Sequence, residues 1–122
     1  MTKILLIDDE ADLLELVSSR LESAGYKVVT AQDGQEGIDK AHSERPDLII
    51  LDLMLPGIDG LEVCKTLKGD AKTSLIPIIM LTGKDSLVDK VLGKVIGADA
   101  YLTKPYDFSD LFEVIKKILP DS

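Results

Sequence analysis

This sequence of 122 residues has few cysteines and no long apolar run, and each of these features excludes some classes of protein. The single cysteine, Cys64, cannot form an internal disulfide. No apolar run approaches the roughly 20 residues that a transmembrane helix needs, and the first residues do not follow the pattern of a signal peptide. We therefore expect a cytoplasmic protein.

Basic residues are also scarce relative to acids. The 22 acidic side chains outnumber the 14 basic ones and give a formal net charge of -8. Affinity for nucleic-acid phosphates depends on Lys and Arg, and an acidic surface does not favour membranes. We expect this chain to bind neither nucleic acid nor membrane directly.

What the sequence does contain is a regular alternation of short apolar runs with longer, helix-like segments. The run at residues 48–51 is uninterrupted, as is typical of a strand that is buried on both faces. It leads directly into Asp52, and the run at residues 4–7 leads in the same way into Asp8 and Asp9. The five apolar runs lie at residues 4–7, 28–29, 48–51, 78–81 and 100–102.

The segments between and after these runs have apolar residues at helical spacing. Acids precede the first helix, and glycines end several of them, as at Gly25 and Gly97. Cys64 falls on an apolar position and is expected in the core, whereas His42 is expected to be an exposed helix residue. The predicted helices cover residues 13–21, 34–44, 61–67, 87–96 and 108–119.

Strict alternation of strand and helix predicts an α/β protein with a parallel sheet and helices on both faces. For five strands the common doubly wound arrangement is the order 2-1-3-4-5, a flavodoxin-like (βα)5 fold. The first and third strands are then neighbours at the point where the connections reverse direction. Ligands of such folds bind at that crevice, beyond the carboxyl ends of the strands.

This topology brings chemically active side chains to one edge. Asp8, Asp9 and Asp52 would lie together there and repel one another unless they bind a cation. Oxygen ligands without His or Cys favour Mg²⁺, which often shares its coordination sphere with a phosphate. Lys104 and Thr82, at the ends of the last two strands, would add a positive charge and a hydroxyl donor. Asp52 is the best candidate to attack a phosphoryl group, because a carboxylate can form an acyl phosphate.

Taken together, these motifs resemble the receiver domain of two-component response regulators, the CheY-like superfamily. The resemblance covers residues 2–119, so residues 1–122 are expected to form a single receiver domain. The sequence leaves open whether that domain stands alone or belongs to a longer regulator. The matching motifs are Asp8-Asp9, Asp52, Pro56 and Gly60, Thr82-Gly83, and the run from Tyr101 to Pro105.

The resemblance implies a phosphoacceptor and a metal site. Asp52 would accept a phosphoryl group from a phosphohistidine on a sensor histidine kinase or a histidine phosphotransfer protein. Asp8, Asp9, Asp52 and the backbone carbonyl of Met54 would bind Mg²⁺. The domain would then be a regulatory switch that promotes its own phosphorylation and dephosphorylation, and not an enzyme.

The resemblance also implies how the switch works. Lys104 would pair with the phosphoryl oxygens, Thr82 would donate a hydrogen bond to them, and Tyr101 would turn inward as Thr82 moves. The bond between Lys104 and Pro105 is expected to be cis, which about one X-Pro bond in twenty adopts.

The surface that responds would be formed by the helix at 87–96, the strand at 100–102 and the helix at 108–119. It would dock an output partner or effector domain, or a second copy after phosphorylation. Lys116 and Lys117 stand where the DNA-binding branch of the family usually has arginines, which argues against that branch's particular dimer. The charged positions of this surface are Lys90, Lys94, Asp107, Asp110, Glu113, Lys116 and Lys117.

Two other functions suit the same topology. An aspartyl phosphatase or phosphotransferase acting on small molecules commonly has a second acid two residues beyond its nucleophile, where this chain has Met54. A flavin-binding electron carrier needs a phosphate-cradling loop after the first strand, where Asp8, Asp9 and Glu10 would instead repel phosphate. Both alternatives are therefore less favoured than the signalling switch.

Overall fold

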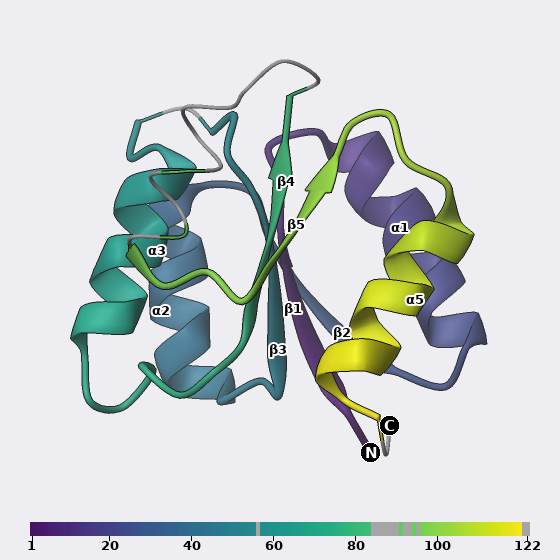
Figure 1. Cartoon of the computed structure of the whole chain (residues 1–122), viewed down its shortest axis with the longest axis horizontal. Helices are drawn as coiled ribbons and strands as arrows, with labels where there is room; N and C mark the ends of the chain where they lie inside the picture. Colours follow the sequence, from purple (N-terminus) through teal and green to yellow (C-terminus); the bar gives the residue numbers. More distant parts are fainter. Residues whose placement is uncertain (56, 84–90, 92–93, 95, 121–122) are drawn as a thin grey trace.

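The computed structural model describes residues 1–55, 57–83, 91, 94 and 96–120. Within them the chain alternates strands and helices around one sheet (Figure 1). The predicted helix at 87–96 lies mostly outside the described residues. The elements are β1 (Lys3–Ile7), α1 (Ala11–Ser23), β2 (Lys27–Ala31), α2 (Gly34–Glu44), β3 (Leu48–Asp52), α3 (Gly60–Gly69), β4 (Ile78–Thr82), β5 (Ala100–Thr103) and α5 (Phe108–Ile118).

The sheet confirms the predicted topology. All its strand pairs are parallel, and the order is β2-β1-β3-β4-β5. In the pairing of β1 with β3, Ile7 lies opposite Leu51. The next residue on each strand is an aspartate, so this register brings Asp8 and Asp52 to the same edge of the sheet.

Both faces of the sheet are covered, as the uninterrupted apolar strands predict. Figure 1 shows α1 and α5 on one face and α2 and α3 on the other. Alternate residues of β1 enter the two cores: Ile4 and Leu6 pack on the side of α1 and α5, and Leu5 and Ile7 on the side of α2 and α3. A rigid, two-sided core therefore holds the strand ends that carry the acids.

The loop after β3 is packed tightly behind Asp52. Asp59 caps α3, because its side chain accepts a hydrogen bond from the backbone N–H of Glu62 at 2.9 Å. A Cβ on Gly60 would lie 2.5 Å from the Cα of Leu53 and 2.8 Å from the carbonyl oxygen of Asp52. Only glycine allows α3 to begin so close to the strand end.

The predicted burial of Cys64 on α3 is confirmed, whereas the predicted exposure of His42 on α2 is wrong. Cys64 is fully buried in the core, as predicted. His42 is not simply exposed: its side chain is 33% accessible and its Nε2 lies 2.8 Å from Oδ2 of Asp70. The reason is that α3 packs beside α2 and ends next to His42, which helical periodicity within α2 does not reveal.

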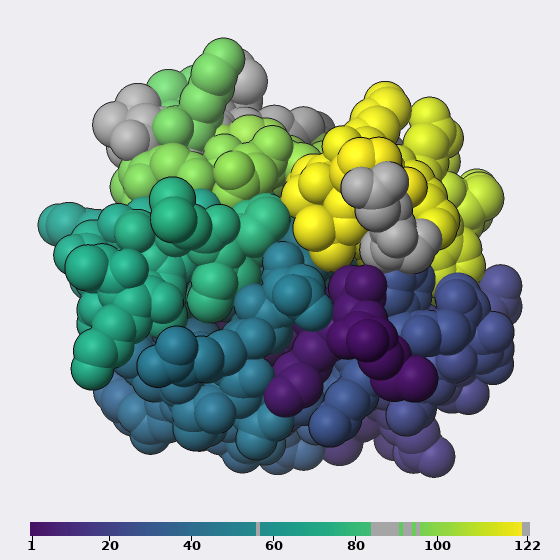
Figure 2. Space-filling view, turned by 90° about the horizontal axis from the view of Figure 1, so that it is seen from below, coloured from purple at the N-terminus to yellow at the C-terminus, as the bar shows by residue number. Residues whose placement is uncertain are grey.

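The amino ends of the strands form the opposite face of the molecule. Figure 2 shows the first residues of the chain, in purple, beside the end of α5, in yellow. Among the described residues, no helix is both long enough and apolar enough to span a bilayer.

Candidate functional site

Asp52, the last residue of β3, is the centre of the candidate site. Its residue is only 1% exposed, and both carboxylate oxygens have partners. Oδ1 accepts a hydrogen bond from the backbone N–H of Met54 at 3.0 Å, and Oδ2 accepts one from Nζ of Lys104 at 2.7 Å. The carboxylate is therefore held in a fixed orientation by a charged donor and a backbone donor.

Lys104 reaches Asp52 from the loop that follows β5. Its backbone N–H donates to the carbonyl oxygen of Thr82 at 2.8 Å, which fixes the start of this loop against β4. The bond between Lys104 and Pro105 is cis, as predicted. Burial alone would lower the pKa of Lys104, but the hydrogen bond that it donates to Asp52 and the charges of Asp52 and Asp8 outweigh this effect, and the pKa is raised. The ammonium stays charged.

Asp8 is the second buried carboxylate of the site. It is 1% exposed, and its Oδ1 accepts a hydrogen bond from the backbone N–H of Glu10 at 3.0 Å. Burial, together with the neighbouring Asp52, raises its pKa from 3.8 to about 6, although the Glu10 N–H and the charge of Lys104 act in the opposite direction. The Glu10 N–H and Lys104 therefore stabilise the negative charge of Asp8 only in part.

A third and a fourth acid lie beside it. Carboxylate oxygens of Asp8, Asp9 and Glu10 all fall within 4.8 Å of one another. Glu10 is not among the predicted ligands, although it directly follows the acidic pair. It occupies the N-cap position of α1 without making a side-chain cap bond. The ordinary capping role of acids before a helix therefore does not account for this cluster.

Asp9, Glu10, Asp52 and Lys104 line one hollow of about 660 Å³ at the carboxyl edge of the sheet, and Asp8 lies buried beside it. Met54 stands at its rim with 72% of its surface exposed. The lining residues are Asp9, Glu10, Asp52, Leu53, Met54, Leu55, Asp59 and Lys104.

Thr82 and Tyr101 each have a buried hydroxyl, although Tyr101 as a whole is only partly buried. Thr82 is fully buried at the end of β4, and its register partner on β5 is Thr103. In the described part of the chain, neither the hydroxyl of Thr82 nor the buried hydroxyl of Tyr101 has a hydrogen-bond partner. Two unsatisfied buried hydroxyls carry a free-energy cost of about 1–3 kcal/mol each. Both groups are therefore available for a partner that the described residues do not provide.

These observations fit a divalent cation bound by oxygen. Hard cations such as Mg²⁺ prefer carboxylate and carbonyl ligands. The buried, incompletely compensated charge of Asp8 and its proximity to Asp9 and Asp52 provide such a donor set. Asp8, Asp9 and Asp52 could hold the ion, and the carboxylate of Glu10 belongs to the same acidic cluster as Asp8 and Asp9.

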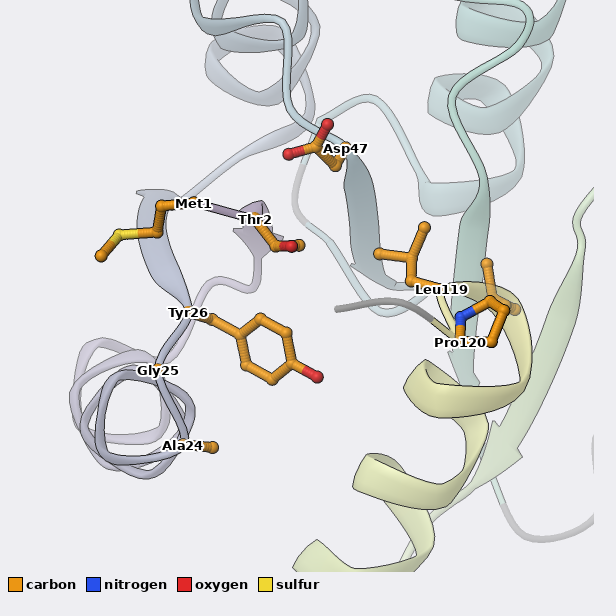
Figure 3. A pocket seen from close by; sticks show the side chains of 9 residues that line it. Met1, Thr2, Ala24, Gly25, Tyr26, Asp47, Leu119 and Pro120 are labelled. Carbon is orange, nitrogen blue, oxygen red and sulfur yellow. The ribbon is translucent and has the colours of Figure 1, made fainter.

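A second hollow, of about 690 Å³, lies at the opposite edge of the sheet (Figure 3). It is lined by the two ends of the chain, the turn before β2 and the start of β3. Among the described residues that line it, Asp47 is the one carboxylate, and its side chain already accepts a hydrogen bond from the backbone N–H of Lys3 at 2.8 Å. The described residues give this hollow no cluster of acids, and it lies at the edge of the sheet opposite Asp52.

Fold and site together define a class: a doubly wound α/β protein with paired acids, a strand-end aspartate and a lysine at the switch point of its sheet. The chain belongs to the response regulator receiver domain family, whose model matches residues 4–116. It is thus a regulatory domain of two-component signalling.

Similar proteins agree with this assignment. The chain is 50% identical over 117 residues to the alkaline phosphatase synthesis transcriptional regulatory protein PhoP of Bacillus subtilis (strain 168). That match covers 96% of this chain and 48% of PhoP, so the chain spans about half the length of this relative.

Solved structures agree as well. The chemotaxis response regulator CheY4 of Vibrio cholerae is 36% identical, with a TM-score of 0.90 over 97% of this chain and 98% of that one. The receiver domain of the sensor histidine kinase PA1611 from Pseudomonas aeruginosa PAO1 is 27% identical, with a TM-score of 0.89 over 98% of each chain. That neighbour was solved with a magnesium ion coordinated in its active site cleft.

Proposed function

We propose that residues 1–122 form a single receiver domain in which Asp52 accepts a phosphoryl group from a phosphohistidine. The donor would be a sensor histidine kinase or a histidine phosphotransfer protein. In this reaction the bond between phosphorus and the donor nitrogen breaks, the donor imidazole keeps the electron pair, and an oxygen of Asp52 forms the new bond to phosphorus. The observation that carries the proposal is the 2.7 Å contact between Asp52 and Lys104 at the edge where Asp8 also lies.

Each residue of the site has a distinct part. Asp8, Asp9, Asp52 and the backbone carbonyl of Met54 would hold Mg²⁺, which when bound neutralises negative charge on the carboxylates and the phosphoryl oxygens. The ammonium of Lys104, which now contacts Asp52, would move to a phosphoryl oxygen once Asp52 is phosphorylated. Positioning and charge neutralisation are the main requirements of phosphoryl transfer.

The buried hydroxyls support a switch. The Oγ1 of Thr82 has no partner among the residues described, so a phosphoryl oxygen on Asp52 would supply one. Tyr101 would follow Thr82, and the surface over β5, α5 and the segment at 87–96 would change. That surface would dock an output partner, an effector domain or a second copy of the chain.

A phosphatase acting on small molecules is less well supported. Its second acid would stand two residues after Asp52, where the exposed Met54 offers no carboxylate. Turnover of a phosphate ester by the purified chain would revive that function.

Incubation with phosphoramidate and Mg²⁺, followed by intact mass spectrometry, tests the proposal. We expect one added phosphoryl group per chain, none in Asp52→Asn, and none for the wild type when Mg²⁺ is removed with a chelator. Glu22→Gln removes an equal charge from an exposed position of α1 and should be labelled like the wild type. Equal labelling of Asp52→Asn and the wild type would refute the assignment of Asp52.

A further inference from the structure

His42, the only histidine of the chain, lies in the last turn of α2 and contacts two oxygens from different elements. Its Nδ1 lies 3.0 Å from the carbonyl oxygen of Ile38, one turn earlier on the same helix. Its Nε2 lies 2.8 Å from Oδ2 of Asp70, the residue that follows α3. The imidazole thus bridges the ends of two neighbouring helices.

Both partners are acceptors, and this fixes the protonation state that satisfies the contacts. A neutral imidazole has one N–H and can donate to only one of the two oxygens. The other ring nitrogen would then direct its lone pair at an oxygen lone pair about 3 Å away. Only the imidazolium, with an N–H on each nitrogen, makes both hydrogen bonds.

The electrostatic surroundings favour the same state. His42 stands at the carboxyl end of α2, where the helix dipole stabilises a positive charge. Among the described residues, the charged groups that interact with it are Asp70 and Lys72, both in the turn after α3. The pKa of His42 is raised by the Ile38 carbonyl and by Asp70, although slight burial and Lys72 act against this.

Asp70 in turn organises the connection from α3 to β4. Its Oδ1 accepts a hydrogen bond from the N–H of Lys72 at 2.9 Å, and its carbonyl accepts from Thr73 and Ser74 at 3.0 and 2.8 Å. A bond from His42 to Oδ2 therefore joins α2 to the whole turn. Figure 1 shows that α2 and α3 both end at the edge of the sheet opposite the carboxyl ends of the strands.

We propose that His42 and Asp70 form a proton-dependent tie between the ends of α2 and α3. The tie is closed while His42 carries both ring protons, and it loses one of its two hydrogen bonds when the imidazole becomes neutral. This device is separate from the phosphoacceptor site, on the other edge of the sheet. It does not depend on the proposed function.

Because the chain has one histidine, the NMR signal of its imidazole can be identified without assigning the rest of the spectrum. The NMR shift of the imidazole Cε1–H proton, followed from pH 5 to 9, should give a midpoint above the ordinary value of 6.5. Asp70→Asn should move that midpoint down. Asp12→Asn removes an equal charge from α1, on the other face of the sheet, and should leave it unchanged. A midpoint at or below 6.5, or one that Asp70→Asn does not lower, would overturn the proposal.

A second measurement covers the case in which Asp70→Asn folds poorly. The folded-state pKa is raised, so the contribution of His42 to stability is complete below the unfolded-state pKa and is lost as pH rises through the folded-state pKa. The gap in the midpoint of urea unfolding between the wild type and His42→Gln should therefore shrink between pH 6 and 9. A gap that stays constant across this range would contradict the tie.

Discussion

Asp8 holds its carboxylate where burial and the neighbouring Asp52 both oppose a negative charge. Its pKa of about 6, against 3.8 in the unfolded chain, means that the folded protein binds more protons between these two values. Stability therefore falls as pH rises through this window and stays reduced above it. The same charge is what a cation would stabilise.

Replacing Asp8 with a neutral isostere should remove this penalty. Without Mg²⁺, we expect Asp8→Asn to unfold at higher urea than the wild type at pH 7.5, by an amount corresponding to about 2–3 kcal/mol. At pH 3.5 the two should be nearly equal, because Asp8 is then protonated in the folded state and mostly protonated in the unfolded state. Asp12→Asn removes an equal charge from an exposed position in the first turn of α1 and serves as the control, which should not unfold at higher urea than the wild type at pH 7.5. A less stable Asp8→Asn at pH 7.5 would contradict this account.

Two glycines near Asp52 should respond differently to an added methyl group. Gly60→Ala would bring a Cβ against the backbone of Leu53 and should cost about 1–3 kcal/mol of unfolding free energy. A Cβ on Gly83 would meet no described atom within 4 Å. Gly83→Ala should therefore keep the wild-type unfolding midpoint. If both variants were equally destabilised, the close approach at Gly60 would not be the reason for its glycine.

At the residue scale the sequence predicted that Asp52 and Lys104 reach the same edge of the sheet, but not that they are in direct contact. Although they are 52 residues apart, their common edge was predictable because each lies at or just after the carboxyl end of a strand of one parallel sheet. The inclusion of Glu10 in the acidic cluster was not, because it depends on the side-chain conformation at the N-cap of α1.

The helices and strands follow closely from local sequence signals. The predicted bounds of α2 match the structure, because Asp33 supplies an N-cap and Pro46 prevents the helix from continuing. The bond between His42 and Asp70, in contrast, could not be predicted from local sequence signals. The two residues are 28 positions apart, and only the packing of α2 against α3 brings them together.

The cap of α2 offers a test at this scale. The side chain of Asp33 accepts a hydrogen bond from the N–H of Glu36 at 2.8 Å, so Asp33→Ala should lower the unfolding free energy by about 1 kcal/mol. Asp33→Ser should restore most of the loss, because a hydroxyl can accept the same bond. Urea unfolding followed by circular dichroism measures both. Equal losses in the two variants would mean that the side-chain bond is not what stabilises the helix start.

At the scale of the whole molecule, the acids of the site lie at the carboxyl ends of two neighbouring strands: Asp8 and Asp9 follow β1, and Asp52 ends β3. A cation that joins the end of β1 to the end of β3 therefore stabilises the folded state as a unit. Because binding to the folded state alone stabilises it by mass action, the effect should reach about 2.7 kcal/mol at a hundred times the dissociation constant.

This linkage can be measured by thermal unfolding with increasing Mg²⁺. We expect the wild-type Tm to rise with Mg²⁺ concentration at pH 7.5, and to rise less at pH 5, where Asp8 is partly protonated and protons compete with the ion. Asp9→Asn should need more Mg²⁺ for the same rise, whereas Glu22→Gln should behave like the wild type. An increase in Tm that Asp9→Asn does not weaken would place the ion elsewhere.

The central claim is that Asp52, and no other carboxylate of the rim, carries the phosphoryl group. Treating the phosphorylated chain with borohydride reduces an acyl phosphate to an alcohol, and peptide mass spectrometry then locates the converted aspartate. We predict homoserine at position 52 and unchanged side chains at Asp8, Asp9 and Asp59. Conversion at one of those three positions, with residue 52 intact, would contradict the account.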